Sequence, residues 1–271
     1  MERTFNYDNR YYDDGIGGFH KASIPHIHEA FFKFKKEYST DILLDFGCGN
    51  GFHGAFLKSQ SKQLSGVDYS DAIQSSSFKA SYDKIYQFDL GKPIDLPHNY
   101  FDMVFSIEVI EHVKDYRKFL QNAYEVLKPG GLFFLTTTTY FWSIFILLVI
   151  YRQKISFTKI YEYLRGLFGS EEYKTRFVVH FWDFFTGHYH GFSKTQIRNG
   201  FKQNNFRIKE IRYLYIQDVV PVYYFNQPYN GRFKFLVNLT LPIVRGLGHA
   251  INYVCRKLHL YSPNVLVVAE K

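Results

Sequence analysis

Short apolar runs alternate with longer amphipathic segments along most of this chain. Each run has the length and composition of a buried strand, and each interval has helix-compatible periodicity. The predicted strands cover residues 42–46, 64–67, 84–90, 101–106, 132–137, 207–216 and 264–270. The predicted helices cover 23–38, 52–60, a stretch beginning near 71, 116–127 and 193–205. Strands and helices that alternate in this way predict an α/β fold with a parallel, doubly wound sheet.

Two segments interrupt the alternation. Residues 138–191 are dense in Phe, Tyr and Trp, and residues 217–263 separate the last two predicted strands. At 271 residues the chain suits one α/β domain with insertions better than two independent domains. We therefore expect a single domain over 1–271, with the two insertions forming a lid over the substrate.

Glycines follow the first predicted strand at every second position. Gly47, Gly49 and Gly51 permit a tight turn with positive φ and let a ligand approach the amides at the next helix N-terminus. Dinucleotide sites use the spacing G-x-G-x-x-G and seat a pyrophosphate. Here the spacing is G-x-G-x-G, and Asp45 precedes the first glycine by two residues. That carboxylate would repel a pyrophosphate but could hold a cationic ligand end.

The segment Leu44–Gly51 resembles motif I of the class I S-adenosylmethionine-dependent methyltransferases. The resemblance implies this cofactor and a Rossmann-like, seven-stranded, mostly parallel sheet with helices on both faces and an antiparallel last strand beside the sixth. It also implies that Asp89, after the third strand, bonds the adenine amino group, although Asp is a common strand terminator. The resulting cofactor-binding set is Asp45, Gly47, Cys48, Gly49, Gly51, Asp68, Tyr69, Asp89 and Ser106.

Asp68 stands at the carboxyl end of the second strand, about twenty residues past the glycines, where a ribose-binding acid belongs in such folds. A helix cap is the alternative role.

A second group of polar residues follows the fourth strand. If Glu108 opens a helix there, Glu108, Glu111 and His112 share one face at the ligand-binding edge. They could hold Mg²⁺, Mn²⁺ or Zn²⁺, with His188 or His190 as a fourth ligand. Alternatively, Glu108 and His112 act without a metal, His112 as general base, or the group is structural.

The E-x-x-E-H element with a distant His resembles the O-methyltransferases of ubiquinone biosynthesis and the small-RNA terminal 2′-O-methyltransferases. The His190-Gly-Phe-Ser193 match favours His190 as the fourth ligand.

The composition suggests an anionic partner and shows an unusually high content of aromatic residues. The formal charge is +8, and 20% of residues are aromatic. Cys48 and Cys255 make no disulfide framework, and the polar N-terminus predicts no secretory signal, which favours a cytoplasmic location. The uncharged run at 132–151 is better explained by a strand followed by a short apolar segment than by a membrane span.

The second insertion has its own pattern. No Asp or Glu occurs between residues 219 and 269, and apolar residues recur at helical spacing beside purely basic ones. Pro242 and the Gly246/Gly248 pair predict a bend or a break into two helices. One interpretation is an interfacial helix at the inner face of a membrane, and the other is packing on the core or on a second subunit.

These observations favour an S-adenosylmethionine-dependent O-methyltransferase acting on a hydroxyl of an apolar, aromatic or lipid-linked small molecule. RNA 2′-O-methylation is the first alternative, but the basic residues interleave with an apolar stripe instead of forming a polar groove. The second alternative is a cofactor-binding scaffold without activity.

Overall fold

The computed structural model describes residues 17–139, 189–214, 234–257 and 264–271. The chain divides into two compact units. The first comprises Met1–Thr138, Phe192–Arg212 and Val265–Lys271, and the second comprises Thr139–Gly191 and Tyr213–Asn264.

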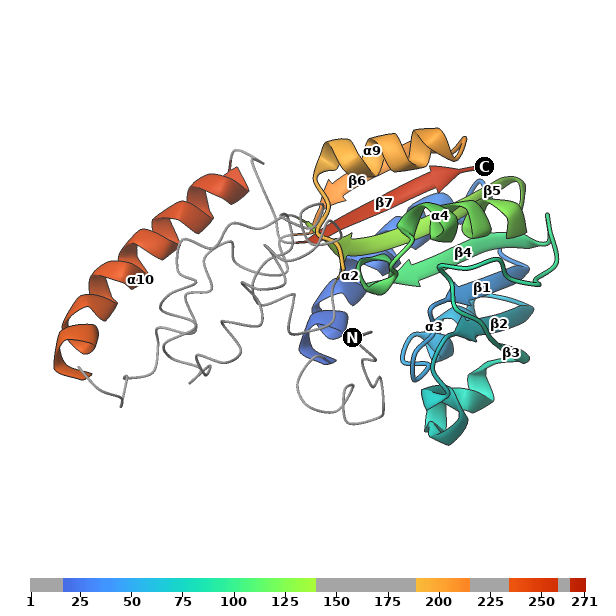
Figure 1. Cartoon of the computed structure of the whole chain (residues 1–271), viewed down its shortest axis with the longest axis horizontal. Helices are drawn as coiled ribbons and strands as arrows, with labels where there is room; N and C mark the ends of the chain where they lie inside the picture. The colour runs from blue at the N-terminus through green and yellow to red at the C-terminus, as the bar shows by residue number, and fades with distance from the viewer. Residues whose placement is uncertain (1–16, 140–188, 215–233, 258–263) are drawn as a thin grey trace, which may run out of the picture. The chain divides into compact units, whose positions relative to one another are not determined.

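A seven-stranded sheet in the order β3-β2-β1-β4-β5-β7-β6 forms the centre of the first unit (Figure 1). Its strands are β1 (Ile42–Phe46), β2 (Gln63–Asp68), β3 (Lys84–Gln87), β4 (Phe101–Ile107), β5 (Leu127–Thr138), β6 (Arg207–Tyr213) and β7 (Asn264–Glu270). The first five pair in parallel. The Gly130 amide donates to the Lys271 carbonyl, and the Lys271 amide donates to that of Gly131, so β7 runs antiparallel to β5. The predicted fold class is confirmed.

Helices cover both faces of the sheet because neighbouring residues of a strand point to opposite sides. Phe134 of β5 packs on Phe31 of α2 (Gly17–Phe34). The preceding residue, Phe133, packs on Phe119 of α4 (Tyr116–Val126) and Phe201 of α9 (Lys194–Gln203). The high aromatic content of the sequence is therefore used partly in two aromatic layers, one on each side of the sheet.

Several predicted boundaries were wrong. The first helix begins at Gly17, so Ser23 does not cap it and Pro25 lies inside it. The expected helix near Asp71 is replaced by two 3₁₀ turns, η1 (Ala72–Ser75) and η2 (Ser77–Ser81). The helix after the glycines, α3, is shorter than predicted, at Gly54–Ser59. Serine-rich segments favour such short turns because their side chains bond nearby backbone amides, as Ser76 does with the amide of Phe78.

The second unit contains α10 (Lys234–Lys257), which continues through Pro242 as one helix of 24 residues. The prediction of two shorter helices was wrong, because one proline removes a single helical hydrogen bond and the flanking turns persist. Among the helices in the described ranges, none is both long and apolar enough to span a bilayer. Most residues of the two predicted insertions, including His188, lie outside the described residues.

Candidate functional site

The candidate site lies where the chain reverses its direction of travel through the sheet. From β1 the chain adds β2 and β3 on one side, and β4 and β5 follow on the other. Ligands of open α/β sheets bind at such a switch point, outside the carboxyl ends of the strands. Here those ends lead into the glycine turn after β1 and the Glu108 segment after β4.

The glycine turn has the backbone geometry that only glycine adopts freely. The φ angles are +96° at Gly47, +54° at Gly49 and +86° at Gly51. A Cβ on Gly47 would lie 2.5 Å from the Cγ atoms of Val109. Gly47 is therefore required both for the turn and for the close approach of the segments that follow β1 and β4.

Asp68 at the end of β2 fixes the same turn. One of its carboxylate oxygens accepts from the Gly49 amide and the other from the Ser70 amide, both at 2.8 Å. Burial raises the pKa of Asp68, and these amides oppose the shift. Asp68 thus ties β2 to the glycine turn and, through the Ser70 amide, to the residues that follow β2.

Asp45 lies beneath the turn, 2% exposed, in β1. Its Oδ2 accepts from the Tyr82 hydroxyl at 2.6 Å. Burial raises the pKa of Asp45 to about 7, with a further contribution from the nearby Asp68 charge. Burial and these two acids also raise the pKa of the Cys48 thiol, which keeps it neutral within the turn.

The other predicted cofactor residues are distributed around this turn. Tyr69, directly after β2, is 63% exposed, which leaves its ring available to a ligand. Asp89 accepts from the Gly91 amide at 3.0 Å and pairs with Lys92 at 3.1 Å, as a residue that terminates a strand would. Ser106 lies fully buried in β4. The structure therefore places Tyr69 at the surface, Asp89 in a turn and Ser106 in the interior.

Glu108 opens the segment after β4 in a conformation that is uncommon for a residue with a side chain. Its φ is +54°, and its amide donates to the carbonyl and the hydroxyl of Thr136. A short 3₁₀ turn, η3 (Ile110–His112), follows. The expected helix from Glu108 is wrong, because a left-handed residue cannot begin a right-handed helix. Backbone strain of this kind concentrates at functional sites.

Glu111 and His112 occupy different environments although they are neighbours. Glu111 is fully buried and accepts from the Thr137 hydroxyl at 2.8 Å. Burial, together with the nearby Glu108 charge, raises the pKa of Glu111 well above its usual range. His112 is half-buried. The structure thus brings Glu108 and Glu111 together, on a base formed by the threonines at the end of β5.

The predicted metal ligands are divided between the two units, with His190 in the second. The Glu108–Glu111 pair offers two oxygen donors suited to a hard cation. Within the described part of the chain, however, no three His, Cys, Asp or Glu side chains form a group that could hold a metal ion. The four-residue ligand set therefore stays a prediction, and the proposed function includes no step that depends on a metal.

Sequence reasoning missed three residues of this site. Tyr82 gave no signal, because its partner Asp45 is 37 residues away. Thr136 and Thr137 belong to the threonine run at the carboxyl end of β5, which in the sequence only interrupts an apolar stretch. Hydroxyl groups at the carboxyl end of a central strand could have been identified as partners for acids at the same edge.

Comparisons with known proteins agree on one type of domain. A family model described as a methyltransferase domain matches residues 20–211. The mitochondrial ubiquinone biosynthesis O-methyltransferase of Mus musculus is 32% identical over 129 residues, which is 45% of this chain and 35% of that relative. The chain spans between about a third and a half of the curated relatives of this kind.

Solved structures resemble the fold at low sequence identity. An S-adenosylmethionine-dependent methyltransferase from Mesorhizobium loti is 16% identical with a TM-score of 0.53, over 92% of this chain and 98% of that one. Phosphoethanolamine N-methyltransferase 2 of Haemonchus contortus, solved with S-adenosyl-L-methionine, is 18% identical with a TM-score of 0.57. The latter match covers 99% of this chain and 60% of the neighbour.

Proposed function

The chain belongs to the methyltransferase-domain family, and from that membership we propose that it transfers a methyl group from S-adenosylmethionine to an acceptor hydroxyl. The observation that carries the cofactor assignment is the charge balance of the site. Asp45, Asp68 and Glu111 are all buried or half-buried at one sheet edge. Within the described residues, no lysine or arginine forms an ion pair with any of them. Such an edge suits a ligand that carries positive charge and no phosphate.

The cofactor, when bound, supplies a methyl group activated by its sulfonium. In the proposed arrangement Gly47–Gly51 admit the ligand close to the backbone, where a Cβ would intrude. Asp68 accepts from the ribose hydroxyls, and Asp45 faces the cationic amino-acid end. His112 accepts the single proton that leaves the acceptor hydroxyl, and the Glu108 carboxylate, whose reach its strained backbone fixes, stabilises the imidazolium that results.

Calorimetry with S-adenosylmethionine and with its demethylated product tests the cofactor assignment. We expect both to bind, and Asp68→Ala to weaken both by at least about tenfold, since it removes an acceptor to the turn and to the ribose. Lys128→Ala, at the opposite edge, is the matched control and should bind normally. Absence of binding to the wild-type chain would exclude every methyltransferase mechanism.

The acceptor is proposed to be apolar, aromatic or lipid-linked. The support is the similarity to ubiquinone biosynthesis O-methyltransferases and the aromatic first insertion. Extracts from cells with and without the gene, compared by mass spectrometry, should differ by one CH₂ on the acceptor.

Glu108→Gln tests the catalytic assignment. It should abolish turnover while cofactor affinity stays near normal. Full activity in a chelator would contradict the predicted metal.

We further propose that α10 binds a membrane surface. Among the α10 residues whose side chains the structure describes, the exposed ones are mostly apolar, with His249 and Lys257 as the polar members, and the others recur at helical spacing: Leu239, Pro242, Ile243, Gly246, Leu247, Ala250, Tyr253 and Val254. Three of them, Leu239, Ile243 and Tyr253, are about two-thirds exposed. The helix and its flanks carry basic residues without acidic ones, which suits anionic lipid. A lipid-linked acceptor would then be met at the bilayer surface, with the protein peripheral to the inner face.

Sedimentation with vesicles tests the membrane proposal. The chain should bind vesicles containing phosphatidylserine and bind purely zwitterionic ones more weakly. Ile243→Ser should reduce binding, whereas Phe32→Ser, which changes an exposed apolar residue of the first unit, should not. A concentration-dependent dimer with no vesicle binding would assign this face to a second copy of the chain instead.

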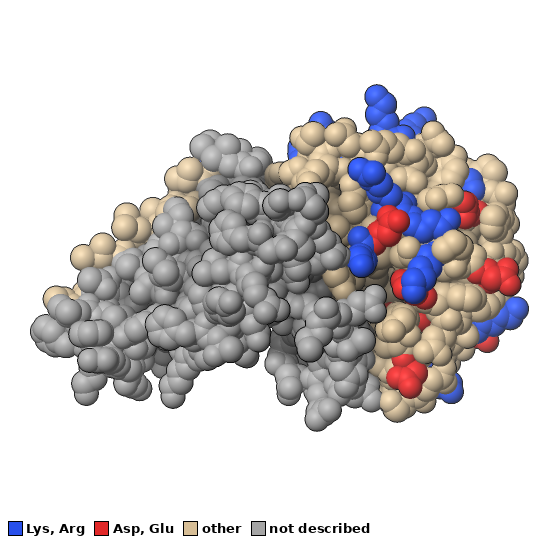
Figure 2. Space-filling model, in the orientation of Figure 1, with Lys and Arg blue, Asp and Glu red and all other residues tan. Residues whose placement is uncertain are grey.

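RNA methylation remains the second candidate because the chain is basic. On the face that Figure 2 shows, however, lysine and arginine side chains of the sheet unit alternate with acidic ones instead of forming a continuous basic patch. Salt-dependent binding of short RNA would support this candidate, and absence of binding at low salt would exclude it. A scaffold role without methyl transfer would require cofactor binding with no turnover of any acceptor.

A further inference from the structure

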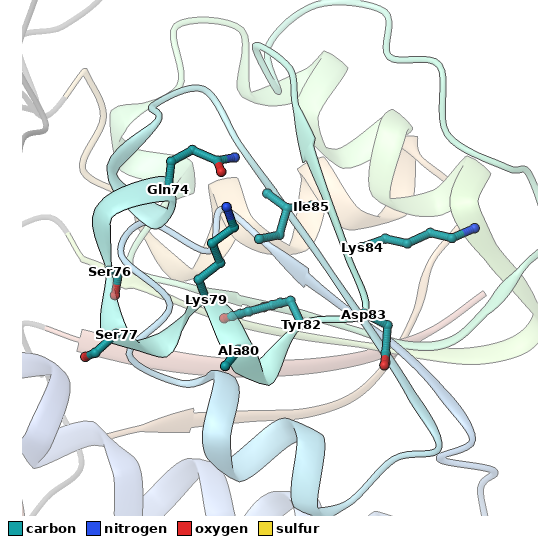
Figure 3. A pocket seen from close by; sticks show the side chains of 9 residues that line it. All are labelled: Gln74, Ser76, Ser77, Lys79, Ala80, Tyr82, Asp83, Lys84 and Ile85. Atoms are coloured by element: carbon teal, nitrogen blue, oxygen red, sulfur yellow. The ribbon is translucent and has the colours of Figure 1, made fainter.

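Tyr82 connects the candidate cofactor site to the edge of the sheet. It lies in extended conformation between η2 and β3 and is only 9% exposed. Figure 3 shows it on this segment beside Lys79 and Ala80, within the lining of a surface pocket of about 670 Å³. The Lys79 side chain points toward Gln74 and the Lys84 side chain points away from both. Most residues that line the pocket are polar and exposed, whereas Tyr82 is buried.

The ring of Tyr82 occupies the space left by three glycines. A Cβ on Gly54, Gly66 or Gly51 would lie 2.6, 2.9 or 3.0 Å, respectively, from ring atoms of Tyr82. These glycines come from α3, β2 and the glycine turn, so one ring packs against the three elements around the site. Glycine at these positions therefore leaves room for the Tyr82 ring, in addition to permitting the backbone turn.

The hydroxyl of Tyr82 has a separate contact. It donates to Asp45 Oδ2 at 2.6 Å, within the protein interior. Burial and the nearby acids raise the pKa of Tyr82, so the phenol stays protonated and remains a donor. The bond occupies one carboxylate oxygen and thereby fixes the orientation of the other, Oδ1.

We propose that Tyr82 is a positioning residue of the cofactor site, which supports the glycine turn with its ring and orients the Asp45 carboxylate with its hydroxyl. This inference rests on the proposed function, because it takes the cationic end of S-adenosylmethionine as the ligand of Asp45. It adds a residue that does not touch the cofactor but determines how the acid beneath the turn meets it.

The same contact controls the charge of Asp45. The titratable groups that act on this carboxyl are Tyr82, Asp68 and Cys48, and none of them is cationic. Burial raises the pKa of Asp45 to about 7, and the Tyr82 hydroxyl holds it below the value that burial alone would produce. Without the hydroxyl a smaller fraction of Asp45 is ionised near neutral pH. A cationic ligand then binds more weakly there, and binding recovers as the pH rises.

Tyr82→Phe tests this proposal because it keeps the ring and removes only the hydroxyl. S-adenosylmethionine affinity of the full chain would be measured by calorimetry between pH 6 and 9. A lost hydrogen bond to a charged group moves the ionisation midpoint by about one pH unit, so affinity should fall about fivefold at pH 7. Near pH 9 the two proteins should converge. The carboxyl resonance of Asp45, followed by NMR, should titrate at higher pH in the variant.

Tyr100→Phe is the matched control. It removes a tyrosine hydroxyl that donates to Gln63 at 3.1 Å, at the amino-terminal edge of the sheet. This variant should keep the wild-type pH profile of affinity. A residue with a purely structural role would lower the unfolding temperature of Tyr82→Phe without moving the pH at which affinity changes, and that result would overturn the proposal.

Asp45→Asn gives an independent test if Tyr82→Phe does not fold. The amide retains an oxygen that can accept from Tyr82 but carries no charge. We expect weak cofactor binding with little pH dependence between 6 and 8, and wild-type affinity would overturn the proposal. If the wild-type chain binds no S-adenosylmethionine, the proposed function fails. If the wild-type chain binds S-adenosylmethionine and the Tyr82 and Asp45 variants bind it with the wild-type affinity and pH dependence, only the inference about Tyr82 fails.

Discussion

Acids at the two edges of the sheet have different partners. At the amino-terminal edge, Asp102 is 7% exposed, pairs with Lys128 at 2.7 Å and accepts from the Ile42 amide. Asp83 at that edge pairs with Lys58 and accepts from the Leu64 amide. At the carboxyl-terminal edge, Asp45, Asp68 and Glu111 receive hydrogen bonds from a phenol, backbone amides and a threonine hydroxyl.

This difference separates stability from function. An acid paired with a lysine has its compensating charge built into the fold, so no ligand is needed. An acid held by neutral donors keeps unsatisfied negative potential, which a cationic ligand can use. We therefore propose that the amino-terminal edge stabilises the sheet and that the carboxyl-terminal edge receives a cationic ligand. The predictions below test this division, beginning with the largest expected effect.

Gly47→Ala should be the most damaging single change. It places a Cβ at φ +96° and within 2.5 Å of Val109, which combines backbone strain with overpacking. We expect a loss of about 3 kcal/mol in the free energy of unfolding and no measurable cofactor binding. Denaturant titration and calorimetry would measure the two effects.

Gly130→Ala provides the matched control at the opposite edge. Its φ is +77°, but nothing lies within 4 Å of the added Cβ, so only backbone strain applies, about 1 kcal/mol. Cofactor affinity should be unchanged. In the double variant Gly47→Ala/Val109→Ala, part of the lost stability should return. Equal losses in the two glycine variants would show that the contact with Val109 has no energetic importance.

The ligand-free protein should lose stability between pH 5 and 8 through Asp45. Its pKa in the folded state is about 7, raised from 3.8 by burial. The folded state therefore holds a proton that the unfolded state has released, and this contribution declines as the pH rises through 7. The expected decline is about 2.5 kcal/mol between pH 5 and 8. Urea unfolding at several pH values would measure it.

Asp45→Asn should remove this pH dependence. Asp83→Asn should act in the opposite sense, because Lys58 lowers the pKa of Asp83 from 3.8 and that contribution is lost as the pH falls below about 3.8. Unchanged pH dependence in Asp45→Asn would show that the buried carboxyl is not the group responsible.

Asp68→Asn and Asp102→Asn should separate affinity from stability. In Asp68→Asn an amide NH₂ replaces one oxygen and faces either the Gly49 or the Ser70 amide, so a donor meets a donor. We expect cofactor affinity to fall at least about tenfold. Asp102→Asn should cost about 1 to 2 kcal/mol of stability and change affinity by less than about twofold. Reversed effects would contradict the division between the edges.

The sequence predicted the architecture because strand and helix periodicity is local. The alternation of the first five strands and the helix that begins after Ser193 follow from short-range patterns, whereas the antiparallel last strand was expected only from the resemblance to the methyltransferase family. The single helix through Pro242 could not be predicted from the sequence, since helix propensity shows where a helix is weak and not where it ends.

The positions of the site residues were predicted less completely than their identities. Glycine spacing and strand-end acids identified Gly47, Asp45 and Asp68 because motif and turn geometry are encoded within a few residues. Tyr82 was not predictable, because its hydrogen bond to Asp45 exists only once β1 and the segment before β3 are brought together. The left-handed backbone of Glu108 was also hidden, since it depends on Thr136 of the neighbouring strand.

The smallest expected effect comes from Lys128→Met, which removes one cation from the amino-terminal edge. Asp102 keeps its bond from the Ile42 amide, and the Lys128 side chain is 39% exposed, so solvent screens much of the ion pair. We expect a loss of about 0.5 to 1 kcal/mol in unfolding free energy and an unchanged cofactor affinity. Denaturant titration beside calorimetry would measure both. Because Lys128 and the glycine turn lie at opposite ends of the strands, a change in affinity would mean that charge is shared across the sheet. Stability would then not be separable from ligand binding, and the comparison between the two edges would fail.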